Sequence, residues 1–371
     1  MKYKLLDLLT EYKETNKDSL YEPVAVGKYG IRKRNEIYKK ELSDDYSKNK
    51  VIRNNTLIVG MGSNQIDIGV LSEDETYSVS PAYHTYWINN RVVNSDYLDL
   101  LFKANNANYF KKYSIATARQ GKKIDLKSLL NEIVDIPSFE EQDTIVGNIF
   151  DINKLIKFEE KSLSLLDELT KSRFNEMFSS FPKVELHELA NIIMGQSPES
   201  SAYNDDGNGI PFFQGKADYG EKYTTVNHYT KSWNKEAKKG YVLMSVRAPV
   251  GPVNIASCDC AIGRGLCAMN AKPARANNEF LYNALNSMQQ EIVLSGKDGS
   301  TFASINKDQV FQLLLPNASI NLQNKFSDFV HQIDKLKFNF LLYHHQMVII
   351  QKYHSFFYRA IVFLLIPFVF L

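Results

Sequence analysis

Positively charged side chains gather in three short stretches of this 371-residue chain, although its net charge is only +2. The stretches are KYGIRKRNEIYKK (28–40), KKYSIATARQGKK (111–123) and YTKSWNKEAKKGY (229–241). Lysine and arginine at this density can bind phosphate oxygens, and an interleaved ring such as that of Trp233 can stack on a base. Each stretch could equally be a solvated surface. The sequence therefore indicates local contacts with nucleic acid and gives no global charge argument for them.

Reading of bases requires polar side chains that reach base edges, close to glycines that let the backbone approach a groove. For Arg247 and Arg264 the alternative is a role in positioning loops, and for Ser63, Asn64 and Ser300 it is ordinary turn formation. The candidates for contact with nucleic acid are Arg32, Arg34, Ser63, Asn64, Gln65, Lys111, Arg119, Gln120, Lys122, Lys123, Gln214, Lys216, Arg247, Arg264, Lys297, Ser300 and Thr301.

Motifs for catalysis are missing from the sequence. FFQGKA (212–217) and SGKDGS (295–300) each contain Gly-Lys but do not complete a Walker A phosphate-binding loop. The Asn-Pro-Pro-aromatic and Asp-Pro-Pro-aromatic tetrapeptides of adenine methyltransferases are absent, and so are G-x-S-x-G and H-E-x-x-H. We therefore expect no catalytic residue in this chain. Nuclease carboxylates can be scattered along a sequence, so an autonomous enzyme acting on nucleic acid stays as an alternative.

The three cysteines, Cys258, Cys260 and Cys267, are too few for a disulfide framework and favour a reduced, cytoplasmic protein. A zinc site needs four ligands, and only His228 precedes them nearby, so we expect no metal. The last residues, IVFLLIPFVFL, are wholly apolar. They are shorter than the roughly 20 residues that a spanning helix needs. We expect no membrane anchor, and interpret them as a buried terminal segment or a shifted reading frame.

The chain repeats one plan at a distance of about 181 residues. DIPSFEEQDTIVGNIFDINKLI (135–156) corresponds to LLPNASINLQNKFSDFVHQIDKL (314–336), with Gln142 matching Gln323. Leu5 matches Leu186 at the same distance, and Leu98 matches Leu281 at 183 residues. This distance is too long for a solenoid repeat and indicates a duplicated domain, with insertions confined to loops.

Each copy ends in a long predicted helix that carries an apolar heptad stripe. After Pro137, Ser138 is expected to cap the first helix, which then runs from about 142 to 178 and would be about 55 Å long. Its stripe is interrupted by Glu159, and the second stripe by Lys337 and His344. We predict that the two helices pack on each other as a coiled coil, although a dimer zipper or ordinary core packing would give similar spacing. The predicted seam residues are Ile145, Ile149, Ile152, Ile156, Leu163, Leu166, Phe326, Val330, Ile333, Phe340 and Met347.

The part of each copy before its helix has strand signals. NTLIVGMG (55–62), YSVSPAYHTYWIN (77–89) and GYVLMSVRAPVGPVNIA (240–256) are apolar or aromatic, β-branched and punctuated by glycine or proline. Short helices are expected near 96–104 and 278–293. The fold class is therefore α+β, with two β-rich domains in pseudo-twofold repeat separated by two long helices. The expected segments are 1–136, 137–180, 181–316, 317–358 and an atypical apolar tail at 359–371.

This frame resembles the specificity (S) subunit of type I restriction-modification systems. The resemblance is carried by motifs in order from about residue 3 to about residue 355. They are GKKIDLKSLLNEIVDIP (121–137), the central helical region at 139–178, NIIMGQSPESSAYN (191–204), IPFFQGKADYG (210–220), LMSVRAPVGPVNIA (243–256), AIGRGLCAM (261–269) and GSTFASINKDQVFQLLLP (299–316).

The resemblance implies that each β-rich domain is a target-recognition domain that reads one half of a bipartite sequence in double-stranded DNA. It implies that the helices form an antiparallel coiled coil, which sets the gap between the halves and binds two methyltransferase subunits, and that motor-nuclease subunits then join. The chain itself would bind no cofactor, whereas its partners would use S-adenosylmethionine, ATP and Mg. The end of the second helix departs from the family pattern, because MVIIQKYHSFFYRAIVFLLIPFVFL (347–371) loses its polar face. A coiled-coil assembly protein without a DNA role is a further alternative. The sequence does not give the bases recognised or the gap length.

Overall fold

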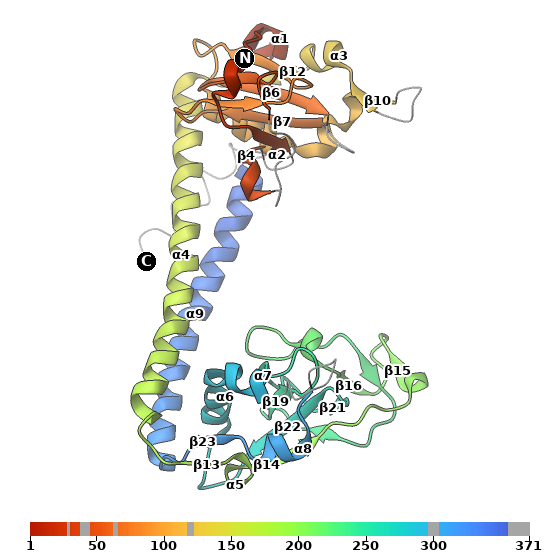
Figure 1. Cartoon of the computed structure of the whole chain (residues 1–371), viewed down its shortest axis with the longest axis vertical. Coiled ribbons are helices and arrows are strands. Elements are labelled where there is room, and N and C mark those ends of the chain that lie inside the picture. The colour runs from red at the N-terminus through yellow and green to blue at the C-terminus, as the bar shows by residue number, and fades with distance from the viewer. Residues whose placement is uncertain (28–29, 38–44, 62–65, 117–121, 296–303, 355–371) are drawn as a thin grey trace. The chain divides into compact units, whose positions relative to one another are not determined.

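The computed structural model describes residues 1–27, 30–37, 45–61, 66–116, 122–295 and 304–354 (Figure 1). Helices and strands alternate along the chain, so the α+β prediction is confirmed. The chain divides into two units. The first contains Met1–Glu159 together with the end of the last helix from Leu342, and the second contains Glu160–Leu341. The predicted boundaries at 136, 180, 316 and 358 separate repeated segments, and they stay a prediction.

In the first unit, a four-stranded antiparallel sheet has the order β2-β9-β6-β7. Two-stranded pairs are formed by β1 with β12, β3 with β4, β5 with β8 and β10 with β11. The strands are β1 (Lys2–Lys4), β2 (Leu9–Glu11), β3 (Val24–Gly27), β4 (Gly30–Lys33), β5 (Lys50–Ile52), β6 (Thr56–Met61), β7 (Ile66–Leu71), β8 (Tyr77–Val79), β9 (His84–Ile88), β10 (Ser114–Ala116), β11 (Lys122–Ile124) and β12 (Ile133–Asp135). The short helices are α1 (Leu5–Leu8), α2 (Ser95–Phe110) and α3 (Leu126–Leu130).

In the second unit, the corresponding sheet has the order β14-β22-β19-β20, and a five-stranded sheet has the order β15-β17-β16-β21-β18. The strands are β13 (Lys183–Glu185), β14 (Ala190–Met194), β15 (Tyr203–Asn204), β16 (Ile210–Phe213), β17 (Tyr229–Thr230), β18 (Glu236–Ala237), β19 (Val242–Ser245), β20 (Val253–Ile255), β21 (Cys260–Ile262), β22 (Leu266–Ala271) and β23 (Leu314–Pro316). The short helices are α5 (Leu186–Leu189), α6 (Asn278–Ser287), α7 (Gln289–Ser295) and α8 (Lys307–Phe311).

The two units share one plan, as the repeat in the sequence predicts. Numbered by their order along the chain, the strands of each four-stranded sheet lie side by side in the order first, fourth, second, third. The opening strand of each copy also pairs with the strand just before the long helix: β1 with β12, and β13 with β23. The matched leucines Leu5 and Leu186 are buried, one in each core. The duplicated sequence therefore encodes a duplicated set of elements.

The first long helix, α4 (Phe139–Phe178), begins directly after the predicted cap Ser138, three residues before the predicted start near 142. The Ser138 hydroxyl accepts a hydrogen bond from the Glu141 backbone N–H at 3.3 Å, and the Glu141 carboxylate accepts one from the Ser138 backbone N–H at 3.0 Å. This reciprocal pair satisfies two donors that the start of a helix would otherwise leave open. Glu140 and Glu141 also lie in the first turn, where negative charge favours the helix dipole.

The second long helix is α9 (Ile320–His354). Of the predicted seam residues, Ile149, Ile152, Phe326, Val330 and Ile333 are buried. The half-buried ones are Ile145, Ile156, Leu163, Leu166, Phe340 and Met347. The three polar residues that interrupt the apolar stripes are covered as well, because Glu159 is buried and Lys337 and His344 are half-buried. Both stripes therefore remain continuous through the charged positions.

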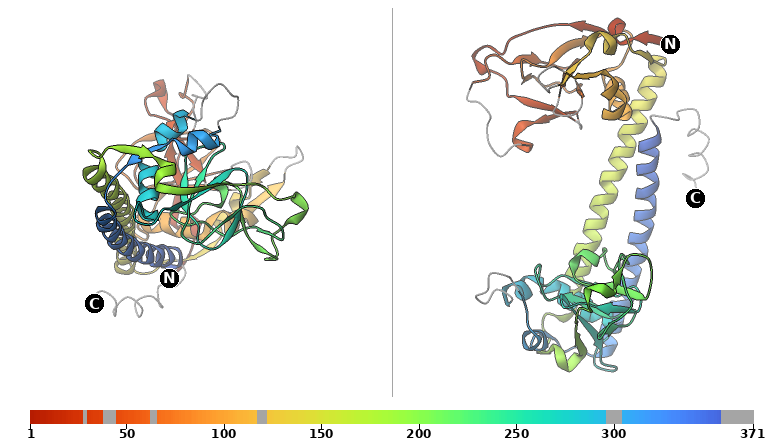
Figure 2. Two further views of the ribbon diagram at one scale, coloured as in Figure 1. Left: turned by 90° about the horizontal axis from the view of Figure 1, so that it is seen from below. Right: turned by 90° about the vertical axis from the view of Figure 1, so that its right-hand side faces the viewer.

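Contacts within each unit show that α4 and α9 are antiparallel neighbours in one chain (Figures 1 and 2). In the first unit, Oε2 of Glu159 lies 3.6 Å from Nδ1 of His344. In the second unit, Asp167 pairs with Lys337, and the rings of Phe174 and Phe326 meet edge to face at 5.5 Å. Residue numbers fall along α9 as they rise along α4. The prediction of an antiparallel coiled coil is thus confirmed.

The second unit has its main core where the four-stranded sheet meets α6 and the two long helices. Phe174, Phe178, Phe280 and Phe326 form an aromatic cluster with ring centres 4.9–5.7 Å apart. Such edge-to-face and tilted pairs add to the gain from apolar burial.

Among the residues described, no helix is long and apolar enough to cross a membrane.

Candidate nucleic-acid interface

Four loops of the second unit converge through backbone hydrogen bonds. Gln196 N–H donates to Ile262 O at 3.0 Å, and Gly263 N–H donates to Phe213 O at 2.8 Å. Val246 N–H donates to Gly265 O at 2.9 Å. These bonds join the loop after β14, the loop after β16, the end of β19 and the turn between β21 and β22. We call this group, residues 195–197, 214–216, 246–247 and 263–265, the loop cluster.

Glycines allow the loops to approach this closely. A Cβ atom on Gly265 would lie 2.3 Å from Gln214 O, and one on Gly195 would lie 2.1 Å from Gly263 O. Both distances are shorter than any real contact of this kind. Only a residue without a side chain fits at these points. The glycines therefore bring the Gln214 loop and the Arg264 turn together.

The loop cluster presents four of the predicted contact residues on its surface: Gln214, Lys216, Arg247 and Arg264 are all exposed. Buried Asp218 holds the first loop, because its carboxylate accepts hydrogen bonds from the backbone N–H groups of Gln214 at 2.6 Å and Gly215 at 3.2 Å. The backbone of a loop is thus fixed by a buried acid while its polar side chains stay free of the core. Arginine, lysine and glutamine are the side chains that read guanine and adenine edges.

Sequence reasoning missed two members of the loop cluster. Gln196 is exposed beside the Arg264 turn, and the Ser197 hydroxyl accepts a hydrogen bond from the Arg264 backbone N–H at 3.1 Å. Their signal in the sequence is Gly195, whose close approach to Gly263 places both residues there. One glycine in a polar stretch is too weak to identify a contact between residues 67 positions apart.

The lysines of the third basic stretch differ in how they are paired. Lys238 is held by Glu236 and by Asp259 at 3.1 Å. These carboxylates raise the pKa of Lys238, and the hydrogen bond that Lys238 donates to Glu236 contributes most. Lys231 and Lys235 are exposed, and the Lys235 carbonyl accepts a hydrogen bond from Ile262 N–H at 3.1 Å, next to the Arg264 turn. Lys231 and Lys235 are therefore better placed than Lys238 for contact with phosphate.

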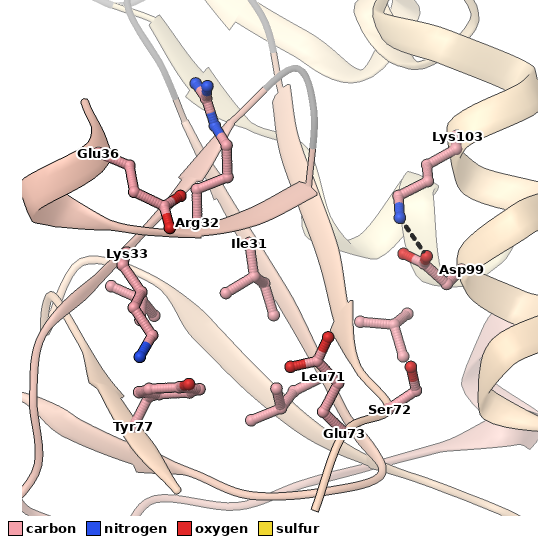
Figure 3. A pocket seen from close by; sticks show the side chains of 12 residues that line it. Ile31, Arg32, Lys33, Glu36, Leu71, Ser72, Glu73, Tyr77, Asp99 and Lys103 are labelled. Atoms are coloured by element: carbon pink, nitrogen blue, oxygen red, sulfur yellow. Dashed lines mark ion pairs between the residues drawn. The ribbon is translucent and has the colours of Figure 1, made fainter. Parts of the chain in front are cut away.

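In the first unit, Arg32 on β4 lines a cavity of about 270 Å³ between the β3–β4 hairpin, β7 and α2. Figure 3 shows Arg32 on one side of this cavity and the ion pair of Asp99 with Lys103, at 2.5 Å, on the other. Burial raises the pKa of Asp99 even though Lys103 lowers it. Glu36 and Glu73 also line the cavity. Cationic and acidic groups are balanced there, so the cavity itself is no phosphate site.

The remaining predicted residues of the first unit are described in part. Arg34 is half-buried, with its guanidinium 5.9 Å from the Tyr46 ring centre. Lys123 is exposed on β11, which forms a hairpin with β10. Lys111 and Lys122 belong to described elements, but their side chains lie outside what is described. Predicted residues that lie wholly outside the described residues are Ser63, Asn64, Gln65, Arg119, Gln120, Lys297, Ser300 and Thr301.

Among the described residues, no group of three or more histidine, cysteine, aspartate or glutamate side chains is placed so that it could hold a metal ion. All three cysteines carry free thiols. Burial raises the pKa of Cys260 and of Cys267 to about 12, so both are protonated and unreactive near neutral pH.

Comparison with known proteins gives a consistent assignment. Residues 179–352 match the family described as type I restriction modification DNA specificity domain. A curated protein of Methanocaldococcus jannaschii, assigned as the type I restriction enzyme MjaX specificity subunit, is 31% identical over 246 residues. That match covers 61% of this chain and 58% of the relative, so it spans less than two thirds of the relative.

Solved structures share the fold over nearly the whole chain. A chain from a study of complex assembly and conformational transition of the type I R-M system is 23% identical, with 96% of each chain covered and a TM-score of 0.65. The S subunit from M. genitalium is 14% identical, with 96% of this chain and 94% of that chain covered and a TM-score of 0.56. The HsdS subunit from Thermoanaerobacter tengcongensis is 21% identical, with 96% of this chain and 95% of that chain covered and a TM-score of 0.50. Residues 179–352 therefore match a type I restriction modification DNA specificity domain, and nearly the whole chain shares the fold of these solved structures.

Proposed function

We propose that this protein is the DNA-recognition subunit of a type I restriction-modification complex and reads a target made of two separated parts. The observation that carries the proposal is the duplicated module. The same four-stranded sheet order occurs twice, and each copy runs directly into one of two long antiparallel helices. A protein built from two readers and a spacer suits a split target better than a continuous one.

The chemistry of the loop cluster supports binding to duplex DNA. Exposed lysines such as Lys216 and Lys231 can neutralise phosphates and position the protein on the duplex. Arg247, Arg264 and Gln214 can form paired hydrogen bonds with base edges in the major groove. Their backbones are fixed by the loop-to-loop hydrogen bonds described above, so little backbone entropy is lost when they bind.

Exposed apolar side chains on the long helices support a second interface, for partner subunits. On α4, Phe150 and Phe158 are 67% and 64% exposed, and on α9 Phe338 is 66% exposed. Large aromatic groups at such exposure are typical of surfaces that a partner covers. We propose that two methyltransferase subunits bind along these helices and that motor-nuclease subunits join them.

In this proposal the chain itself is not catalytic. Its partners bring S-adenosylmethionine for methyl transfer, and ATP and Mg for translocation and cleavage. The role requires access to the DNA of the cell, so the proposed location is the cytoplasm.

The proposal is tested with the complex of this chain and its methyltransferase partner on a pool of DNA with randomised bases. We expect methylation at one split motif. Replacing Arg264 by alanine should relax the base preference in one half of that motif, because one bidentate contact provides about 1–3 kcal/mol of discrimination. The other half should keep its preference.

The matched control is Arg275→Ala, which removes another exposed arginine outside the loop cluster. It should leave both halves unchanged. Methylation without regard to sequence by the unaltered complex would contradict the proposal, and so would DNA cleavage by this chain alone in the presence of a divalent metal.

A further inference from the structure

Each long helix is joined to its β-rich module by one fully buried glutamine. These are Gln142 in the first turn of α4 and Gln323 in the first turn of α9, and both have no exposed surface. They match each other in the duplicated sequence. A buried amide is costly unless its polar atoms are bonded, so its partners indicate why the residue is there.

The two glutamines make the same three hydrogen bonds. Gln142 Oε1 accepts from Asn94 N–H at 2.7 Å, and its Nε2 donates to Val92 O at 3.2 Å and Pro137 O at 3.0 Å. In the second unit, Gln323 Oε1 accepts from the Asn277 N–H at 3.1 Å. Its Nε2 donates to the carbonyls of Arg275 at 3.0 Å and Ala318 at 2.9 Å. Every partner atom belongs to the backbone, so the pattern does not depend on neighbouring side chains.

A second contact reinforces each glutamine. The Asn94 amide donates to the Asp143 carboxylate at 2.9 Å, and the Asn277 amide donates to Asn324 Oδ1 at 2.9 Å. Asn94 and Asn277 also cap the helix of their own module, by accepting hydrogen bonds from Asp96 N–H and Phe280 N–H at 2.8 Å. Each junction therefore binds together the chain before the long helix, its first turn, and the capped start of α2 or α6.

Such a junction fixes a direction as well as a contact. One amide plane bonded to two separate backbone segments leaves the start of the helix little freedom to rotate. A helix of 40 residues is about 60 Å long, so rotation by roughly 3° at its base moves its far end by about 3.4 Å, one base-pair step. Small errors at the junction would thus become errors in the gap.

We infer that Gln142 and Gln323 are the positioning residues that set which gap between the two half-sites the protein accepts. The inference rests on the proposed function. Neither residue belongs to the loop cluster, so we expect them to act through the direction of the long helices. Gap selection and base selection are accordingly controlled by different residues.

The test uses Gln142→Met and Gln323→Met in the full complex. Methionine is unbranched and of similar length but cannot make the three bonds. Methylation rates are compared on the target with its natural gap and on targets with one base pair added or removed. We expect the ratio between the natural and altered gaps to fall by roughly tenfold, since misplacements near 1 Å can change rates by up to about a hundredfold. Base preferences within each half should not change.

Matched controls are Gln332→Met on α9 and Asn148→Met on α4, which alter exposed side chains of the same helices and should keep the wild-type ratio. If the buried variants do not fold, Asp143→Ala and Asn324→Ala remove only the exposed reinforcing bonds and should lower the ratio in the same direction. Folded variants with the wild-type ratio would overturn the inference. A wild-type complex that ignored the gap would instead overturn the proposed function.

Discussion

Phe326 is the residue whose removal tests the packing of the two long helices most sharply. Its side chain has no exposed surface, and its ring meets those of Phe174 and Phe178 edge to face, both at 5.5 Å. Phe174 and Phe178 belong to α4, whereas Phe326 belongs to α9. Truncation of Phe326 therefore removes contacts that exist only if the helices pack on each other in this register.

The expected cost of Phe326→Ala follows from this burial. A fully buried phenylalanine replaced by alanine typically costs about 3–5 kcal/mol, because transfer energy is lost and a cavity remains. Because the lost aromatic pairs add to this cost, we expect Phe326→Ala to lower the free energy of unfolding by about 4 kcal/mol. The control is Phe338→Ala on the same helix, which is 66% exposed and should cost less than about 1 kcal/mol.

The assay is urea unfolding followed by tryptophan fluorescence. The chain has two tryptophans, Trp87 in the first unit and Trp233 in the second. In a Trp87→Phe background Trp233 reports on the second unit, and in a Trp233→Phe background Trp87 reports on the first. We expect Phe326→Ala to lower the midpoint of the unfolding transition that Trp233 reports by about 1.3–4 M urea for an energy near 4 kcal/mol. A loss no larger than that of Phe338→Ala would refute the helix pairing.

Three further outcomes follow from the structure. Burial raises the pKa of Glu159 on the seam, and nearby His344 opposes the rise. The stability that Glu159 contributes is therefore fully present below the ordinary pKa of glutamate. It is lost as the pH rises through the raised pKa of Glu159 in the folded protein. Glu159→Gln should therefore raise the melting temperature at pH 7 but not at pH 4, and an equal change at both values would contradict the burial of Glu159. Because burial raises the pKa of Cys260 and Cys267 to about 12, mass spectrometry after brief maleimide treatment at pH 7.5 should find half-buried Cys258 labelled first and the other two only on unfolding; rapid triple labelling would contradict this packing. Lys231→Glu with Lys235→Glu should weaken DNA binding by the complex and reduce the salt dependence of log K by about 2 if each lysine contacts one phosphate, whereas Lys238→Glu, at a site already paired with Glu236 and Asp259, should have less effect.

Local signals in the sequence predicted the long helices well. The cap at Ser138 and the heptad stripe depend on residues three or four positions apart, and these interactions survive in the folded protein. The 181-residue repeat likewise predicted two modules with matching elements. Such features were accessible because each one is encoded within a short segment or within a comparison of two segments.

Long-range contacts could not be predicted in this way. Glu159 and His344 each interrupted a stripe, and their proximity depends on how α4 and α9 align. The match of Gln142 with Gln323 was visible in the sequence, but their carbonyl partners Val92 and Arg275 lie 50 and 48 residues away. The loop cluster has the same origin, since Gly195 approaches Gly263 only after β14 and β22 pair.

Sequencing of modified bases tests the central claim most directly. DNA is taken from cells that express this chain together with its methyltransferase partner, and from cells that express the partner alone. We expect modification at one motif of two short parts separated by a constant number of unspecified bases, present only when this chain is expressed. An uninterrupted motif, or the same pattern without this chain, would contradict the account.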